Sequence, residues 1–271
     1  IVMEKAAKNL TSVTLELGGK SPSIVDQTAD IKNIVKKMVW GKLVNNGQVC
    51  VAPDYCLLQE SIKDQFIQAY SEEVKKMYGD DPEKSSDYCR IINYSHYMRI
   101  KNLIESAIED GAESLLPLKF NDETNYISPA LLLNVSLKSK IMHEEIFGPV
   151  LPIILYENLQ QALEIINSKE RPLALYMNST NAKDIEKVSR QTKSGALSIN
   201  HNIVHFFNSN LPFGGINNSG LGASHGEFGF LAFTHQKAFF HQWFPIAASQ
   251  LIAPPYTNFT KKIIYLAQKY F

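Results

Sequence analysis

Short apolar runs typical of β-strands alternate along this chain with helical segments of about ten or more residues. The strand-like runs cover residues 13–17, 55–58, 131–133, 150–156 and 196–199. Helical periodicity covers residues 31–44, 61–77, 95–109, 159–167 and 184–192. Because parallel strands must be joined by long crossovers, this alternation predicts an α/β fold with a mainly parallel sheet.

The composition excludes several functional classes. Hydrophobic residues make up 45% of the chain and charged residues 20%, and Lys+Arg 27 balance Asp+Glu 27. A neutral chain lacks the positive field that draws proteins onto nucleic acid, so no nucleic-acid partner is expected. The cysteines Cys50, Cys56 and Cys89 are too few and odd in number for a disulfide framework, which favours a reducing, cytoplasmic location.

The two ends of the chain differ from its body. The chain starts at Ile1 without an initiator methionine, and residues 1–10 suit one side of a helix, so we expect a fragment that begins inside a helix. Residues 238–271 are aromatic and apolar, but no stretch approaches the ~18–20 apolar residues that span a bilayer. Residues 261–270 are expected to form an amphipathic helix on the cytosolic face of an intracellular membrane, on a partner subunit or on its own protein.

The glycine-rich segments and the cysteines and histidines do not match the usual phosphate-binding, dinucleotide-binding or metal-binding motifs. The segment at residues 18–21 lacks the earlier glycine of a phosphate-binding loop, because Thr14 occupies that position. In residues 220–226 the final glycine comes one residue too late for a dinucleotide fingerprint. No cysteine or histidine spacing suggests a metal site, so no metal is expected.

A cysteine in a turn and a glutamate at a strand end are the candidate reactive groups. Cys50 follows a turn at residues 45–47, and its small and polar neighbours would leave room for a substrate. Glu16 ends a strand, a place where α/β proteins commonly carry functional side chains. One interpretation is a nucleophile with its base; the other is an inert buried cysteine with a surface glutamate.

Four strings, in order, resemble the signatures of the aldehyde dehydrogenase superfamily. They are LELGGKSP at 15–22, NGQVC at 46–50, EEIFGP at 144–149 and PFGG at 212–215. Further strings at 50–55, 90–93, 203–205, 213–220, 224–226 and 254–257 are similar to the class 3 and fatty aldehyde dehydrogenase branch.

The resemblance implies a domain organisation and a partner. Residues 1–18 would be the remnant of a Rossmann-type NAD(P)-binding domain and residues 19–215 the aldehyde dehydrogenase-like catalytic domain. Residues 216–271 would be a glycine-rich segment and a C-terminal tail for oligomerisation or membrane contact, in a homodimer. Since the family's cofactor loop would precede Ile1, the isolated chain is expected to bind nicotinamide cofactor weakly or not at all.

The resemblance also implies a reaction at Cys50. Its thiolate would attack an aldehyde carbonyl, with the Cys50 backbone N–H as one donor to the oxyanion. A hydride would pass to NAD or NADP, and Glu16 would activate the water that hydrolyses the thioester to a carboxylic acid. The aldehyde would be aliphatic or aromatic, of medium to long chain. A cofactor-independent thiol esterase and a non-catalytic subunit or interaction module are the alternatives.

By the same resemblance, Glu145 would bind the nicotinamide ribose and Phe147 would pack beside the nicotinamide. His205 and His225 lie in segments that line the substrate tunnel of class 3 relatives, where each would contact substrate or simply pack as an ordinary histidine. Asn200 matches an asparagine common in the family and is expected to act by position rather than by chemistry.

Overall fold

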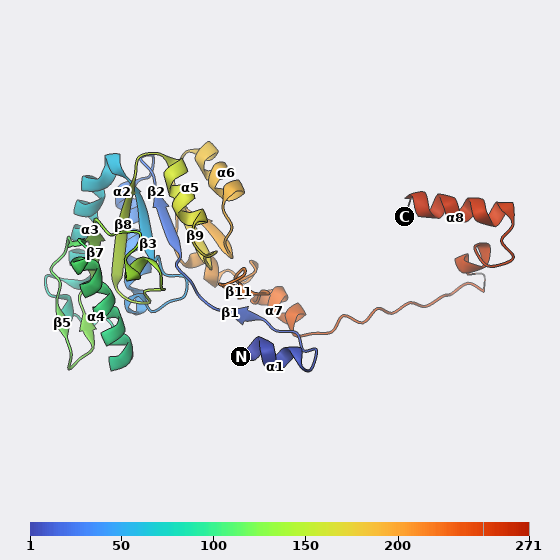
Figure 1. Cartoon of the computed structure of the whole chain (residues 1–271), viewed down its shortest axis with the longest axis horizontal. Coiled ribbons are helices and arrows are strands. Elements are labelled where there is room, and N and C mark those ends of the chain that lie inside the picture. Colours follow the sequence, from blue (N-terminus) through green and yellow to red (C-terminus); the bar gives the residue numbers. More distant parts are fainter. Residues whose placement is uncertain (246, 271) are drawn as a thin grey trace. The chain divides into compact units, whose positions relative to one another are not determined.

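The computed structural model describes residues 1–245 and 247–270, in two compact units, Ile1–Phe233 and Thr234–Phe271. The first unit is built on a seven-stranded sheet with the order β10-β9-β2-β3-β8-β7-β4 (Figure 1). Every pair in this sheet is parallel except β4 with β7. The strands are β2 (Pro22–Val25), β3 (Tyr55–Gln59), β4 (Glu113–Ser114), β7 (Ala130–Leu133), β8 (Val150–Tyr156), β9 (Ala174–Asn178) and β10 (Ala196–Ile199). The expected mainly parallel α/β fold is confirmed.

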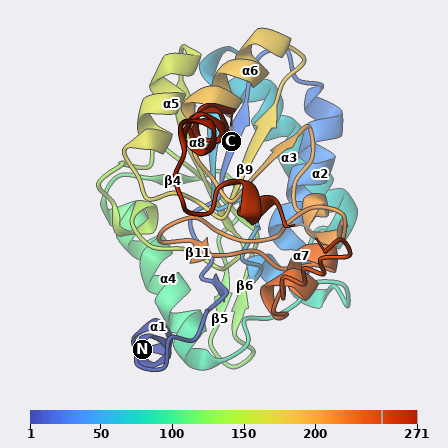
Figure 2. The same cartoon turned by 90° about the vertical axis from the view of Figure 1, so that its right-hand side faces the viewer.

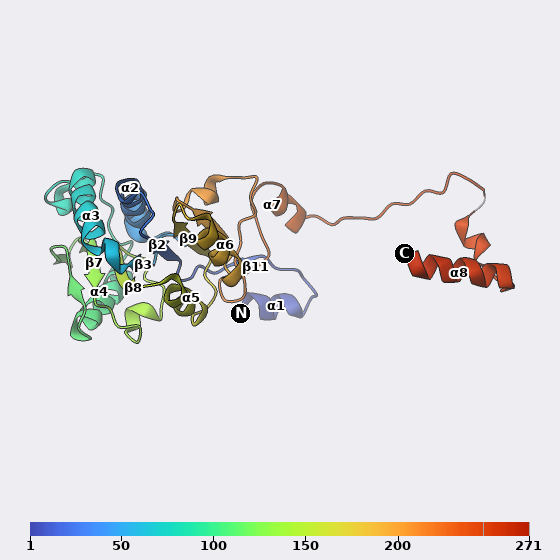
Figure 3. The same cartoon turned by 90° about the horizontal axis from the view of Figure 1, so that it is seen from above.

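Helices cover both faces of this sheet. Figure 3 shows α2 (Ile31–Leu43) and α3 (Lys63–Tyr78) on one side, with α4 (Tyr94–Glu109) and α5 (Leu159–Asn167) on the other. Neighbouring strand residues point to opposite faces. Thus Ile24 packs in the core under α4 and α5, whereas Val25 packs in the core under α2 and α3. Helix α6 (Ala182–Gln191) lies beside α5 (Figure 2).

The expected helices all exist, within a few residues of their expected bounds. Asp30 is the N-cap of α2, and its carboxylate accepts a hydrogen bond from the Asn33 N–H at 3.3 Å. Strands β2 and β9 were not predicted. All of their residues are buried, and a buried run of only four or five residues cannot be told from part of a helix by its periodicity.

The strand expected at residues 13–17 is shorter than predicted. Only β1 (Leu15–Glu16) forms, and it pairs antiparallel with β11 (Gly220–Leu221) outside the main sheet. Gly220 has φ +152°, and a side chain there would reach within 2.4 Å of the Leu15 carbonyl oxygen. The two short strands can therefore approach each other only because this residue is glycine.

Smaller elements complete the first unit. They are α1 (Val2–Ala7), the hairpin of β5 (Phe120–Asn121) and β6 (Tyr126–Ile127), and α7 (Gly226–Ala232). Helix α1 has no buried residue. The domain boundaries expected after residues 18 and 215 stay predictions.

The second unit carries the helix expected near residues 261–270. This helix is α8 (Asn258–Tyr270), and it begins three residues before the expected start. Among the residues that the structure describes, no helix combines the length and the apolar character needed to cross a membrane. From residue 228 to the C-terminus the sequence has no Asp or Glu, so the only side chains in α8 that carry a full charge are the lysines.

Candidate active site

The loop that carries Cys50 is a tight turn at the C-terminal end of α2. Residues with positive φ follow one another there: Asn45 at 49°, Asn46 at 57° and Gly47 at 75°. The buried Asn46 side chain donates to the Cys89 carbonyl at 3.0 Å, and the Gln48 side chain donates to the Arg90 carbonyl at 3.1 Å. These bonds fix the conformation of residues 45–50, which we call the nucleophile loop.

Cys50 is half-buried against a small apolar cluster, and two carboxylates lie near its thiol. Burial raises the pKa of Cys50 to about 12, together with the negative charges of Glu16 and Glu145 and an interaction with the Glu16 side chain. The structure therefore brings together the two residues that the sequence proposed as nucleophile and base. The protein's own groups hold Cys50 as a thiol rather than a thiolate.

Glu16 and Glu145 meet at the Gly18–Gly19 turn. The Glu16 carboxylate accepts a hydrogen bond from the Gly18 N–H at 3.0 Å. Gly18 has φ +74°, and a β-carbon at this position would be 2.8 Å from a carboxylate oxygen of Glu145. A side chain at residue 18 would displace the Glu145 carboxylate. Glycine is therefore needed here for two reasons: it adopts the positive φ, and it leaves room for that carboxylate.

Glu145 is a half-buried carboxyl group with oxygen atoms suited to accept hydroxyl donors. Its pKa is raised to about 7, mainly by burial and then by the charge of Asp54, while the Gly19 N–H and Lys20 partly offset this rise. Phe147, two residues on, is 38% exposed and has φ +51°. The same loop thus carries a carboxyl group that can accept hydroxyl donors and, two residues on, an exposed aromatic ring.

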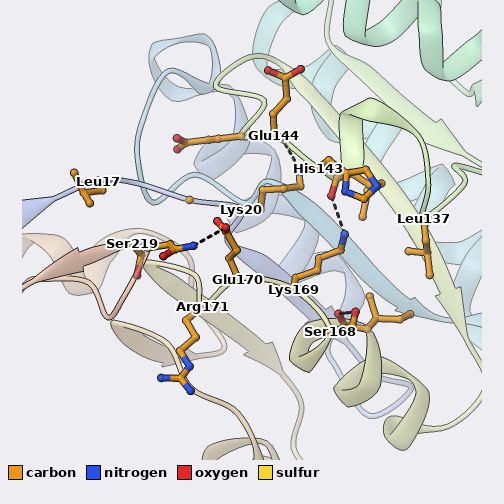
Figure 4. A pocket seen from close by; sticks show the side chains of 15 residues that line it. Leu17, Lys20, Leu137, His143, Glu144, Ser168, Lys169, Glu170, Arg171 and Ser219 are labelled. Carbon is orange, nitrogen blue, oxygen red and sulfur yellow. Dashed lines mark hydrogen bonds between the residues drawn. The ribbon is translucent and has the colours of Figure 1, made fainter. Parts of the chain in front are cut away.

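A cavity of about 560 Å³ adjoins Glu145. Its lining includes Leu17, Gly19, Lys20, Glu144, Glu145 and the segment 168–171. In Figure 4 the Lys20 side chain reaches toward Glu144, whereas Arg171 points away from both. Glu145 therefore lines this cavity, whereas Cys50 and Glu16 do not.

A buried ion pair fixes the segment before Phe147. Lys20, 12% exposed, pairs with Asp54, 3% exposed, at 2.8 Å. The Lys20 ammonium also donates to the Glu144 carbonyl at 2.9 Å, and Asp54 accepts from the Ile146 N–H at 3.1 Å. Neither Lys20 nor Asp54 was predicted to have a role, although both lie within strings that resemble the family's.

The nucleophile loop touches the segment 144–148, which we call the Glu145 loop. A β-carbon on Gly47 would lie 2.2 Å from the Gly148 carbonyl oxygen, and Gly47 has φ +75°. Any other residue at position 47 would clash with this carbonyl, so the backbones of the two loops pack directly against each other.

His205 and His225 belong to an aromatic cluster that packs beside Cys50. The His205 ring lies 6.0 Å from that of Tyr176, whose pKa is raised by burial and by the neighbouring Cys50. His225 stacks on Phe213 at 4.9 Å. Burial lowers the pKa of His205, and within the described residues neither of its ring nitrogens has a hydrogen-bond partner. Contact of either histidine with substrate stays a prediction.

Asn200 joins the ends of two neighbouring strands. It has φ 57°, and its side chain both accepts from the Ser179 N–H and donates to the Ser179 carbonyl, each at 2.9 Å. This is the geometry expected of a residue that acts by position. The carbonyl of Asn200 also accepts from Lys37 of α2 at 2.8 Å.

Lys42, in the last turn of α2, is an ionisable group that the sequence analysis did not single out. It is 1% exposed, and burial lowers its pKa from 10.5 to about 8; Asp54 and Glu145 raise it and Lys20 lowers it further. At pH values where the buried lysine is charged, a shift of this size lowers the free energy of unfolding by about 3 kcal/mol. The folded state loses this proton first, so stability rises with pH between about 8 and 10.5.

Replacing Lys42 by methionine is therefore expected to raise the free energy of unfolding at pH 7 by roughly 2–3 kcal/mol. The advantage over the wild type should shrink toward pH 10, where the wild-type lysine is neutral when folded. Urea unfolding at pH 7 and pH 10 measures both effects. Lys36→Met, on the exposed side of the same helix, serves as the control and should change little. A Lys42→Met variant less stable than wild type at pH 7 would contradict the cost assigned to burial.

Comparison with known proteins gives a consistent set of matches. The model of the "Aldehyde dehydrogenase family" matches residues 1–239. The chain is 47% identical over 238 residues to "Aldehyde dehydrogenase family 3 member A2" of Rattus norvegicus, covering 88% of this chain and 48% of that protein. It is 45% identical over 239 residues to "Aldehyde dehydrogenase, dimeric NADP-preferring" of the same organism, covering 88% and 51%.

A solved structure, "Substrate bound state of Staphylococcus Aureus AldH", matches with a TM-score of 0.93 at 39% identity, covering 98% of this chain and 57% of that chain. The chain thus spans about half the length of the curated relatives it matches.

Proposed function

Because the chain belongs to the aldehyde dehydrogenase family, we propose that it carries the reactive groups of an enzyme that oxidises an aldehyde to a carboxylic acid with NAD or NADP. The observation that carries the proposal is that two carboxylates meet at the Gly18–Gly19 turn and both lie near one thiol. Glu16 and Glu145 both act on the charge state of Cys50, and Glu145 lies against Gly18.

The proposed reaction begins at the Cys50 sulfur. The thiol passes its proton through the Glu16 carboxylate to solvent, the thiolate attacks the aldehyde carbonyl, and the Cys50 N–H donates to the resulting oxyanion. When the oxyanion collapses, the carbon loses a hydride and becomes a thioester of Cys50. Glu16 then removes a proton from a water molecule, which attacks the thioester and releases the acid and the thiol.

The nicotinamide cofactor would supply the hydride acceptor. Glu145 is proposed to accept hydrogen bonds from its ribose hydroxyls, and Phe147 to pack against its ring. A carboxyl group whose pKa is raised to about 7 gains from hydroxyl donors, because they stabilise its ionised form. The cavity beside Glu145 supports the assignment of Glu145; Phe147 is not among the residues that line it.

The substrate, partner and location follow as further parts of the proposal. The aromatic cluster beside Cys50 supports an aldehyde with a medium to long aliphatic chain or an aromatic group, in contact with His205 and His225. A relative named as dimeric supports a homodimer.

Residues 216–271 are proposed to serve oligomerisation or peripheral membrane contact, which the uniformly positive charge of α8 supports. The unpaired cysteines support a cytoplasmic location.

The test is aldehyde-dependent formation of NADH or NADPH by the full-length gene product, with aldehydes of increasing chain length. We expect turnover with both cofactor and aldehyde present, and none when either is omitted. Hydrolysis of activated esters without any aldehyde-dependent reduction of cofactor would overturn the proposal in favour of a thiol esterase.

A further inference from the structure

Helix α4 and the segment before it connect the nucleophile loop with the Glu145 loop. The segment bonds to the nucleophile loop at three points. Besides the bonds that Asn46 and Gln48 donate to the carbonyls of Cys89 and Arg90, the Gln48 side chain accepts from the Ile92 N–H at 2.9 Å. The chain then enters α4 at Tyr94, so the first turns of this helix are tied to the loop that presents Cys50.

The same helix also holds the Glu145 loop, through Arg99 in its second turn. The Arg99 guanidinium donates to the Glu145 carbonyl at 3.1 Å and to the Ile146 carbonyl at 2.7 Å. It also forms an ion pair with the Glu144 carboxylate at 3.6 Å. The next residue, Ile100, packs so closely on the loop that a β-carbon on Gly148 would come within 2.8 Å of it. One rigid element therefore contacts both loops.

The Glu145 loop requires external support because its conformation is unfavourable by itself. Phe147 has φ +51°, a region that a bulky aromatic residue rarely adopts. The Glu145 carboxyl group also lies among negative charges, since Asp54 and Glu16 both raise its pKa. Lys20 and Asp54 anchor the loop from the sheet, and Arg99 supplies a positive charge and two donors from the helix.

We propose that Arg99 is a positioning residue: it fixes the Glu145 carboxyl group and the Phe147 ring relative to Cys50 by binding the backbone of their loop. This rests on the proposed function, in which Glu145 and Phe147 receive the cofactor. Within the described residues Arg99 forms no hydrogen bond with Cys50 or Glu16, so cofactor-independent reactions at Cys50 should depend on it far less than cofactor binding does.

The first experiment compares Arg99→Met with Lys101→Met in the full-length gene product. Lys101 lies on the same helix and pairs with Asp122 at 3.2 Å, away from the Glu145 loop. Arg99→Met is expected to raise the KM for cofactor about tenfold, because a small displacement of a binding group has a large effect. Ester hydrolysis without cofactor should change by no more than a few-fold, since Arg99 contacts neither the nucleophile nor its base. Arg99→Lys, with one charged donor group, should give an intermediate KM, and Lys101→Met should match the wild type.

The second experiment measures hydrogen exchange of the backbone amides in residues 144–148 of the chain itself. Arg99→Met should exchange faster in this segment than wild type, and Lys101→Met should not. An unchanged KM together with unchanged exchange would overturn the role of Arg99 while leaving the proposed function intact. A wild-type protein without cofactor-dependent aldehyde oxidation would refute the proposed function, and the exchange result would still decide whether Arg99 holds the loop.

Discussion

Replacing Cys50 by alanine is expected to reduce both aldehyde oxidation and ester hydrolysis by about 10⁴-fold or more. The reason is that every covalent step of the proposed reaction takes place on this sulfur. The fold should survive, because Cys50 is only half-buried and alanine removes a single atom from an existing turn. Steady-state rates of the full-length gene product, with thermal unfolding in parallel, measure the two effects.

The other cysteines provide matched controls for this variant. Cys56 is fully buried in β3, so Cys56→Ala should lower stability by about 1–2 kcal/mol and leave the rate per folded molecule unchanged. Cys89 is exposed, and Cys89→Ala should change neither quantity. Activity that survives in Cys50→Ala but falls in either control would remove Cys50 from the reaction.

Replacing Glu16 by glutamine is expected to change two properties of the site in opposite directions. Hydrolysis of the thioester should slow by about 10²–10⁴-fold, because the general base for the attacking water is lost. The Cys50 thiol, in contrast, should become easier to ionise: Glu16 is one of the charges that raise its pKa to about 12, and glutamine removes that charge. At pH 8 the variant should therefore have more thiolate and react several-fold faster with iodoacetamide.

The alkylation is best measured in a Cys89→Ala background, since Cys89 is exposed and would react as well. Glu145→Gln is the matched control for charge, because Glu145 also raises the pKa of Cys50. Glu145→Gln should speed alkylation, while its rate of ester hydrolysis should stay within a few-fold of the wild-type rate. Slower alkylation in Glu16→Gln would show that its charge does not oppose the thiolate, and unchanged ester hydrolysis would show that it is not the base.

The bounds of most helices were predictable because their causes are local. In α5, expected at residues 159–167 and observed at Leu159–Asn167, Asn158 caps the first turn by accepting from the Gln161 N–H at 3.3 Å. Strand β8 was found for the same reason, as one unbroken apolar run at Val150–Tyr156. Strands β2 and β9 were missed because a buried run of four or five residues has no periodicity that separates a strand from part of a helix; only pairing in the sheet, as of β9 with β10 and β2, decides it.

The features of the candidate site also fall into those set by local sequence and those set by the tertiary structure. The sequence by itself determined the residue types that are proposed to do the chemistry, since a thiol after a tight turn, a glutamate at a strand end and a glutamate two residues before a phenylalanine can be read from short strings. Only the tertiary structure decided how these groups affect one another. The charge of Glu145 reaches Cys50 across 95 positions of the chain, Lys20 pairs with Asp54 across 34, and Arg99 binds the carbonyls of Glu145 and Ile146 across 46 and 47. Electrostatic and hydrogen-bond energies depend on distance and burial in space, and neither quantity is set by neighbours along the sequence.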